Sequence, residues 1–316
     1  MYEKFFGLKE SPFSINPDPR YLFLTRHIQE ALACLIYGIQ SRKGFILLTG
    51  EVGTGKTTVI NKLLEWCRQE QVSSAFVFNP RLSEAEFFDF MIADFGIACD
   101  SQMKSRLLIR LNQWLLERYE SGQRAVLIVD EAQNLSPDML EEIRLLTNLE
   151  TSTHKLLQIV LAGQPELEEK LNYPELRQLR QRITLWARTR PLTILETHGY
   201  VTERLHIAGY SGGELFTTDA IEALNRYSHG IPRIINLLAE HSLITAFVEQ
   251  HKVISEKIVQ EVARDFYLQE GVSPGAATAA KAPASSGSHP MLVDSLPSGQ
   301  RPATGSFSKA AGEKKT

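Results

Sequence analysis

The chain has 316 residues, of which 43% are hydrophobic and 22% are charged, a balance typical of a soluble globular protein. Its formal net charge of −3 gives no general attraction to nucleic acid or to an anionic membrane. No apolar run approaches the roughly 18 residues of a membrane span, so we expect no transmembrane segment. Three widely spaced cysteines favour neither a disulfide framework nor a zinc site, which predicts a cytoplasmic protein.

Aromatic and proline residues crowd positions 1–25, which we treat as an N-terminal arm. Pro12, Pro17 and Pro19 exclude a long helix there. Two compatible interpretations stay open: the rings pack on the neighbouring domain, or they form a wall on the adenine side of a nucleotide site. From residue 27 to 39, apolar residues recur at helical spacing and predict a core helix.

A glycine-rich stretch, residues 50–58, matches the P-loop pattern of a glycine, four residues and then Gly-Lys-Ser/Thr. The apolar run 45–49 predicts a buried strand before it, and helical spacing across 59–66 predicts a helix after it. Backbone N–H groups of the loop and the positive end of the helix dipole would hold phosphates. The predicted nucleotide contacts are Gly50, Glu51, Val52, Gly53, Thr54, Gly55, Lys56, Thr57 and Thr58.

Two side chains of this loop have predicted roles in ATP chemistry. Lys56 would reach the β- and γ-phosphates, and the Thr57 hydroxyl would ligate Mg²⁺. We expect Lys56 to lie in a solvent-facing loop, so that its removal abolishes ATP binding without unfolding the protein. The alternative is a glycine-rich turn without a ligand, which the register of strand, loop and helix disfavours.

Buried strands alternate with amphipathic helices along the next hundred or so residues. This alternation predicts a three-layer α/β domain with a parallel sheet, with ligands at the carboxyl ends of the strands. We assign residues 26–190 to this domain. Its further strands are expected at 74–79, 125–129 and 156–162, and its further helices at 103–120 and at 83–95, where Ser83 and Glu86 have capping-box spacing.

Polar residues follow two of these strands directly. Asp130 would hold Mg²⁺, directly or through water, and Glu131 would orient and polarise the attacking water. An acidic pair that caps the next helix is the alternative. Gln164 follows the next strand, where its amide could hold the water or the γ-phosphate. Alternatively, Gln164 only fixes the bend between Gly163 and Pro165.

Arginines recur before and after the last apparent strand. Arg177, Arg180 or Arg182 could act as an arginine finger towards the γ-phosphate of a neighbouring subunit. We favour Arg182 slightly, because it adjoins the start of the strand, where the geometry is firmer. The alternative is a solvated helical face with surface salt bridges. With Arg188 and Arg190 the stretch is also a basic patch, which keeps nucleic acid open as a partner.

After about residue 190 the strand pattern stops, and we predict a small all-helical second domain over 191–270. Arg233 follows Pro232 at the start of one helix, a position that suits proline, and could reach the phosphates when this domain closes over the nucleotide. Across 271–316, Ala, Ser, Gly and Pro predominate, so we expect a disordered tail, with a tether or a partner-binding tail as the alternative. The predicted helices are 196–208, 217–228, 233–249 and 255–268.

Together these residues resemble the AAA+ ATPases over roughly residues 1–268. The resemblance implies a P-loop NTPase fold, an αβα nucleotide domain followed by a helical lid. In the terms of that family, residues 50–57 look like Walker A, Asp130 and Glu131 like Walker B, Gln164 like sensor 1, Arg180 or Arg182 like the finger, and Arg233 like sensor 2.

The likeness narrows to the general secretion pathway protein A (ExeA-like) group, which includes ATPases of type II secretion, pilus biogenesis and exosortase or exopolysaccharide systems. The stretches that carry it include Phe5-Phe6-Gly7-Leu8, Asp130-Glu131-Ala132-Gln133-Asn134-Leu135 and Ala162-Gly163-Gln164-Pro165-Glu166-Leu167. Secretion members carry a membrane span and a peptidoglycan-binding domain after the lid, where we expect a disordered tail here.

The resemblance implies ATP and Mg²⁺ as cofactors and ATP hydrolysis that drives a conformational change. It also implies a homo-oligomer that serves secretion, pilus or exopolysaccharide-export proteins, either in the cytoplasm or peripheral to the inner membrane through a partner. Two alternatives stay open: a DNA-associated ATPase of the transposition-helper kind, and a nucleotide-gated scaffold with little turnover.

Overall fold

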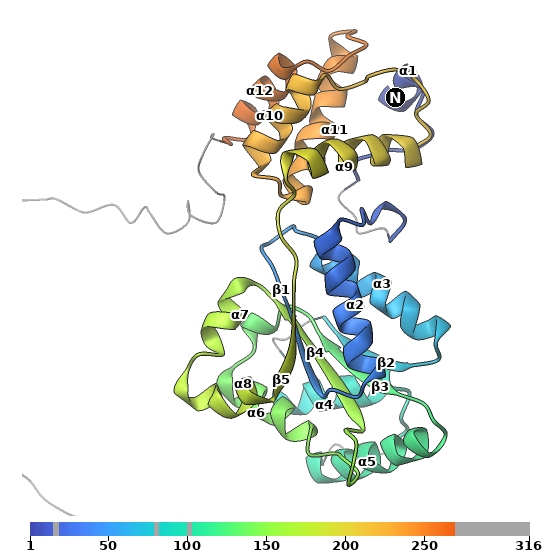
Figure 1. The fold of residues 1–316 in the computed structure, drawn as a ribbon, viewed down its shortest axis with the longest axis vertical. Helices are drawn as coiled ribbons and strands as arrows, with labels where there is room; N and C mark the ends of the chain where they lie inside the picture. The colour runs from blue at the N-terminus through green and yellow to red at the C-terminus, as the bar shows by residue number, and fades with distance from the viewer. Residues whose placement is uncertain (15–18, 79–81, 100–102, 269–316) are drawn as a thin grey trace, which may run out of the picture. The chain divides into compact units, whose positions relative to one another are not determined.

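The structure, a computed structural model, describes residues 1–14, 19–78, 82–99 and 103–268 (Figure 1). The chain divides into two units, and all described residues belong to the first, Met1–Pro274. The expected disorder of 271–316 concerns residues outside the described ranges. Within those ranges, no helix combines the length and the apolar character needed to cross a membrane.

Five strands of the described chain form one parallel sheet in the order β2-β3-β4-β1-β5. Every residue of β1, β3 and β4 is buried, as uninterrupted apolar runs in the middle of a parallel sheet predict. The strands are β1 (Phe45–Thr49), β2 (Ser73–Val77), β3 (Ala125–Val129), β4 (Leu157–Gly163) and β5 (Ile183–Arg188).

Helices cover both faces of this sheet. Successive strand residues point to opposite sides, so each strand contributes apolar side chains to both helical layers. Ile46 and Leu48 belong to an apolar cluster with α2 (Arg26–Gln40) and α3 (Lys56–Gln69), which lie side by side in Figure 1. Phe45 and Leu47 belong to another cluster on the opposite face. The predicted three-layer α/β fold is therefore confirmed. The second cluster includes residues of α4 (Glu84–Asp94), α5 (Lys104–Glu120) and α6 (Pro137–Leu146).

The described residues after β5 form helices, as expected, and share an apolar cluster with the N-terminal arm. The helices are α9 (Ile194–Ile207), α10 (Thr218–Ser228), α11 (Pro232–Val248) and α12 (Glu256–Asp265). The domain boundary at residue 190 stays a prediction. Shorter helices elsewhere are α1 (Tyr2–Phe6), α7 (Pro165–Lys170) and α8 (Arg177–Arg182).

Capping side chains in the sequence fix where several helices begin. The capping box predicted for Ser83 and Glu86 is confirmed at the start of α4. Thr193 and Glu196 form a second box at α9, and the Ser136 hydroxyl accepts a hydrogen bond from the N–H of Met139 at α6. These local interactions hold the chain directions that bring the strand ends together.

The N-terminal arm packs its rings into the helical cluster rather than onto the sheet. Tyr2, Phe6, Leu8 and Phe13 are buried there, and the Phe13 ring lies edge-on to Phe216 with 5.8 Å between centroids. The first interpretation expected the rings on the neighbouring domain, residues 26–190, whereas these side chains pack with the helices that follow β5.

Candidate nucleotide site

A cavity of about 420 Å³ lies where the P-loop, the N-terminal arm and the start of α11 meet. Its wall includes Val52 to Thr58, Glu131 and Arg233. The P-loop follows β1 and Glu131 follows β3, so both lie at the carboxyl edge of the sheet, as predicted. Tyr21 and Phe23 of the arm also line the cavity, and an adenine wall there stays a prediction.

Lys56 is buried, with 6% of the residue exposed, so the expectation of a solvent-facing lysine is wrong. Because α3 begins at Lys56, its Cα–Cβ bond tilts back towards the loop. Its Nζ donates hydrogen bonds to the carbonyl oxygens of Gly50 at 2.6 Å and Glu51 at 3.0 Å. Burial lowers the pKa of Lys56, and the carboxylates of Glu131 and Asp130 partly oppose that shift.

Glycines let the P-loop pack closely against residues that follow in the chain. A Cβ on Gly50 would lie 2.0 Å from Thr189 Oγ1, just after β5. Gly53 has φ +82°, and a Cβ there would lie 2.8 Å from Arg233 Cβ. The Arg233 N–H donates to Gly53 O at 3.2 Å, which ties the start of α11 to the loop. The Arg233 guanidinium has no hydrogen bond to any described residue and lines the cavity, so it can contact a phosphate.

Two oxygen donors suited to Mg²⁺ lie together beside the P-loop. Thr57 Oγ1 lies 3.5 Å from Asp130 Oδ2. Asp130 is buried, and this burial raises its pKa, whereas the hydrogen bond from the Glu131 N–H and the charge of Lys56 lower it. Mg²⁺ prefers one or two protein oxygens with waters and phosphate oxygens as its other ligands, so this pair fits the ion.

Glu131 projects its carboxylate from a left-handed turn, with φ 52° and ψ 33°. Its Oε2 accepts a hydrogen bond from Gln164 Nε2 at 3.2 Å. Glu131 precedes the 3-10 helix Ala132–Asn134 and Gln164 precedes α7, but neither side chain makes a capping bond, and the two side chains bond to each other instead. The catalytic roles of both residues stay predictions. The structure thus brings Lys56, Thr57, Asp130, Glu131 and Gln164 together.

Gln133 is a site residue to which the sequence reasoning gave no role. Its Nε2 donates to Glu131 Oε2 at 2.5 Å, and its Oε1 accepts the N–H of Gln164 at 3.1 Å. A backbone N–H only donates and a carboxylate only accepts, so both contacts fix the same amide orientation. No spacing pattern predicts this contact, because it depends on the left-handed turn at Glu131. A Cβ on Gly163 would lie 2.8 Å from Gln133 Oε1, which explains the glycine there.

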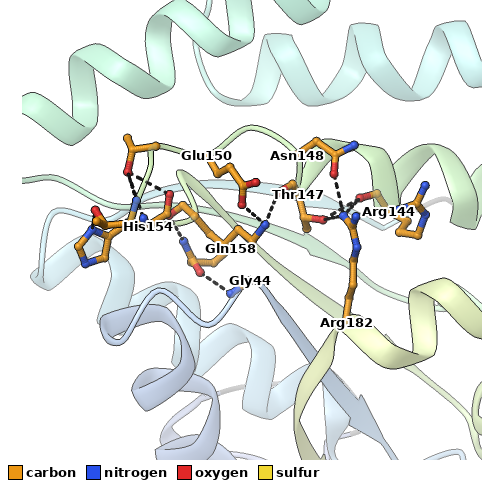
Figure 2. Close-up of polar contacts among 11 residues, drawn as sticks. Gly44, Arg144, Thr147, Asn148, Glu150, His154, Gln158 and Arg182 are labelled. Carbon is orange, nitrogen blue, oxygen red and sulfur yellow. Dashed lines mark hydrogen bonds and ion pairs between the residues drawn. The ribbon is translucent and has the colours of Figure 1, made fainter.

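The three candidate finger arginines have different surroundings. Figure 2 shows Arg182 at the end of α6, where its Nη1 donates to Thr147 Oγ1 at 2.6 Å and to Asn148 Oδ1 at 2.9 Å. Arg177 and Arg180 are exposed and make no side-chain hydrogen bond or ion pair with the described residues. Arg182, the residue favoured from sequence, is therefore engaged within its own chain.

The basic patch is partly neutralised. Arg188 donates to both carboxylate oxygens of Glu168, with its Nη2 at 2.6 Å and its Nε at 3.0 Å. Thr49 also donates to Glu168, at 2.5 Å, so the carboxylate links the end of β1 to the end of β5. These bonds leave fewer free cations for a nucleic-acid phosphate than the sequence suggests.

Comparison with known proteins gives a domain match and a related sequence. Residues 39–171 match the family described as AAA domain. Over 256 residues, 80% of this chain, the sequence is 47% identical to the General secretion pathway protein A of Aeromonas hydrophila. The chain spans 46% of the length of that relative.

Solved structures with the same fold include the ORC2 protein of Aeropyrum pernix, with a TM-score of 0.60, 15% identity, and coverage of 87% of this chain and 75% of that one. Cdc6p of Pyrobaculum aerophilum gives a TM-score of 0.61, 17% identity, and coverage of 84% and 73%. At these identities the likeness concerns the fold alone. The chain therefore carries an AAA domain on a P-loop α/β fold and, over four-fifths of its length, resembles the general secretion pathway protein A group.

Proposed function

We propose that this chain is a Mg²⁺-dependent ATPase. The observation that carries the proposal is that three separate segments meet at one edge of the sheet. Lys56, Thr57 and Glu131 line the cavity, and Asp130 and Gln164 lie within hydrogen-bond distance of Thr57 and Glu131. Phosphoryl transfer needs little beyond positioning and charge stabilisation, and these residue types supply both.

Each residue has a role in this proposal. The P-loop N–H groups hold the phosphates, and Lys56 exchanges its bonds to the Gly50 and Glu51 carbonyls for phosphate oxygens. Thr57 and Asp130 would hold Mg²⁺, whose charge would stabilise the phosphoryl group. Glu131 orients the attacking water and accepts its proton, while Gln164 positions the Glu131 carboxylate.

The contact between Arg233 and Gly53 supports a conformational response to the nucleotide. Arg233 is joined to the P-loop through its own N–H, and its guanidinium is available to a phosphate. A bound γ-phosphate would therefore draw the start of α11 towards the loop, and its release would loosen that link. We infer that this motion is passed to a neighbouring copy and to a partner of the secretion or export machinery, an inference that draws on the similarity to General secretion pathway protein A.

Steady-state phosphate release from the full chain tests this proposal. We expect Mg²⁺-dependent turnover, and we expect Glu131→Gln to bind ATP normally while losing at least about 100-fold in turnover, because the amide cannot accept the proton of the water. Glu169→Gln is the matched control, since Glu169 is an exposed carboxylate of α7 outside the cavity wall. ATP binding without measurable turnover in the parental chain would instead identify a nucleotide-gated scaffold.

A further inference from the structure

Asn236 lies in the wall of the same cavity, in α11, one turn after Arg233. Three residues along a helix return a side chain to nearly the same face, about 4.5 Å further along the axis. The start of α11 is bonded to the P-loop through the Arg233 N–H. A nucleotide with its phosphates on the loop would therefore extend its nucleoside part towards Asn236.

The hydrogen bond from Tyr200 to Asn236 leaves one end of the Asn236 amide free. Arg204 Nη1 donates to Tyr200 Oη at 2.9 Å, and a guanidinium can only donate. Tyr200 Oη in turn donates to Asn236 Oδ1 at 2.8 Å. Burial raises the pKa of Tyr200, which keeps its hydroxyl protonated as a donor. The amide oxygen is thus occupied, and the two N–H donors are the remaining end.

The start of this chain of bonds is itself held firmly. Arg204 is buried, and its Nε donates to the carbonyl oxygen of Pro12 at 2.6 Å. Its guanidinium also lies over the ring of Tyr21, 4.4 Å from the centroid. The orientation of Asn236 therefore depends on the N-terminal arm as well as on α9.

The free end of Asn236 needs an acceptor that the described residues do not supply. Asn236 is 7% exposed, and its Nδ2 has no hydrogen bond to any of them. Asn236 lines the cavity and its Nδ2 is not fully buried, so a molecule in the cavity can reach this donor. Tyr21 and Phe23, in the same wall, offer the aromatic faces on which a base can stack.

We propose that Asn236 is a specificity-determining residue that donates a hydrogen bond from Nδ2 to a ring nitrogen of the adenine base. The inference rests on the proposed function, because it assumes that a nucleotide occupies the cavity. It assigns Tyr200 and Arg204 as positioning residues, since they act on the base only through the orientation of the Asn236 amide.

Removing acceptors from the ligand tests the proposal without altering the protein. Calorimetry on the full chain would compare ADP with its 1-deaza, 3-deaza and 7-deaza analogues, each of which replaces one ring nitrogen by C–H. We expect one analogue to bind about 3- to 10-fold more weakly than ADP, the loss expected for one hydrogen bond, and the others to bind like ADP. If all three bind as tightly as ADP, the proposal is wrong.

Variants then connect the sensitive ring nitrogen to Asn236. Asn236→Leu, of nearly the same shape, should weaken ADP binding by a similar factor and remove the difference between ADP and the sensitive analogue. Tyr200→Phe should reduce that difference, because the amide is then free to flip. Parental ADP affinity in Asn236→Leu would overturn the proposal.

Inorganic tripolyphosphate distinguishes a failure of the proposed function from a failure of the role of Asn236, since it would occupy only the P-loop. Its affinity should be the same for the parental chain and Asn236→Leu. A parental chain that binds neither tripolyphosphate nor ADP would remove the proposed function and this inference together. Normal ADP binding that depends on no ring nitrogen would remove only the role of Asn236.

Discussion

Lys56 and Asp130 are charged side chains that the ligand-free protein buries. Burial lowers the pKa of Lys56 and raises that of Asp130, so the fold disfavours the charged form of each, and their mutual attraction offsets this only in part. Phosphates and Mg²⁺ would restore the missing charge partners. Buried ionisable side chains whose charged forms are disfavoured cost folding stability, and such side chains are common at functional sites.

Asp130→Asn should therefore stabilise the ligand-free protein while weakening its response to Mg²⁺. A raised pKa means that the folded state binds a proton more readily than the unfolded state, so ionisation of Asp130 costs stability above that pKa. A neutral amide of the same shape removes this cost, and the melting temperature at pH 7 should rise by a few degrees.

The pH dependence of stability checks the cause of that gain. As the pH rises from the unfolded pKa of an aspartate through the raised pKa of Asp130, this carboxylate lowers the stability of the parental chain. The stability difference between Asp130→Asn and the parental chain should therefore grow over that window and level off above it. An equal difference at every pH would mean that the gain comes from packing.

Gln133→Leu should lower the turnover number about tenfold with little change in nucleotide affinity. Gln133 is bonded to both the Glu131 carboxylate and the Gln164 backbone, and small displacements of catalytic groups can cost as much as 100-fold in rate. Turnover and ADP affinity, measured separately, test this. Gln133→Glu should be worse than Gln133→Leu, because its carboxylate would repel Glu131. Unchanged turnover in both variants would leave Gln133 as a packing residue only.

At the scale of elements, two cationic side chains bind the C-terminal end of α6. Figure 2 shows Arg182 bonded to Thr147 and Asn148, and Lys155 Nζ donates to Thr147 O at 2.9 Å. The last carbonyls of a helix lack intrahelical partners and carry partial negative charge, so cations there are stabilising. The interaction ties α8, and with it the arginine stretch, to α6.

Arg182→Ala should accordingly destabilise the protein by roughly 1–2 kcal/mol, the sum of charge-assisted hydrogen bonds that are partly exposed. Arg180→Ala is the matched control from the same helix and should change stability by less than about 0.5 kcal/mol, as exposed substitutions usually do. Urea unfolding of both variants distinguishes the two roles. Equal stabilities would mean that the bonds at the end of α6 contribute nothing measurable.

The sequence predicts those elements whose pattern is local. Apolar runs identify β1, β3 and β4, and capping residues identify the start of α4, because each of these depends on a few adjacent side chains. The pattern of the P-loop is equally local, since its strand, glycines, lysine and helix follow one another in the sequence. The packing of the N-terminal arm does not depend on adjacent residues. The burial of Phe13 depends on Phe216, some two hundred residues later in the chain.

Contacts between distant segments also explain what the site prediction misses. The burial of Lys56 follows from the exact start of α3, which the apolar spacing across 59–66 does not fix. The bonds of Gln133 and Asn236 join residues whose neighbours in sequence give no sign of them. The sequence favours Arg182 over Arg180 as the finger, and only the contact with α6 shows that Arg182 is bonded within its own chain.

At the scale of the molecule, the cavity is closed by segments from both ends of the described chain. The N-terminal arm reaches it through Tyr21 and Phe23, and α11 reaches it through Arg233 and Asn236. The exposed arginines of α8, by contrast, are not part of the cavity wall. An arginine outside the wall of its own site can act on ATP only in another subunit.

The finger proposal now favours Arg180, because a finger must leave its own subunit and Arg182 is bonded to α6. Arg180→Ala should spare ATP binding and lower hydrolysis, by up to the roughly 1,000-fold or more that a finger can contribute. Arg182→Ala should lower hydrolysis only as far as it destabilises the fold. Phosphate release measured alongside ADP affinity separates these effects.

Mixing two inactive variants tests whether the site is shared between subunits. A Lys56→Ala subunit lacks a working loop but keeps its finger, whereas an Arg180→Ala subunit keeps its loop and lacks the finger. Mixed oligomers would contain some sites with both parts, so activity should return in proportion to their number. Arg177→Ala in place of Arg180→Ala tests the other exposed candidate of α8 in the same way. If mixed oligomers form, as native mass spectrometry can establish, and no pairing restores hydrolysis, each subunit must hold a complete site of its own.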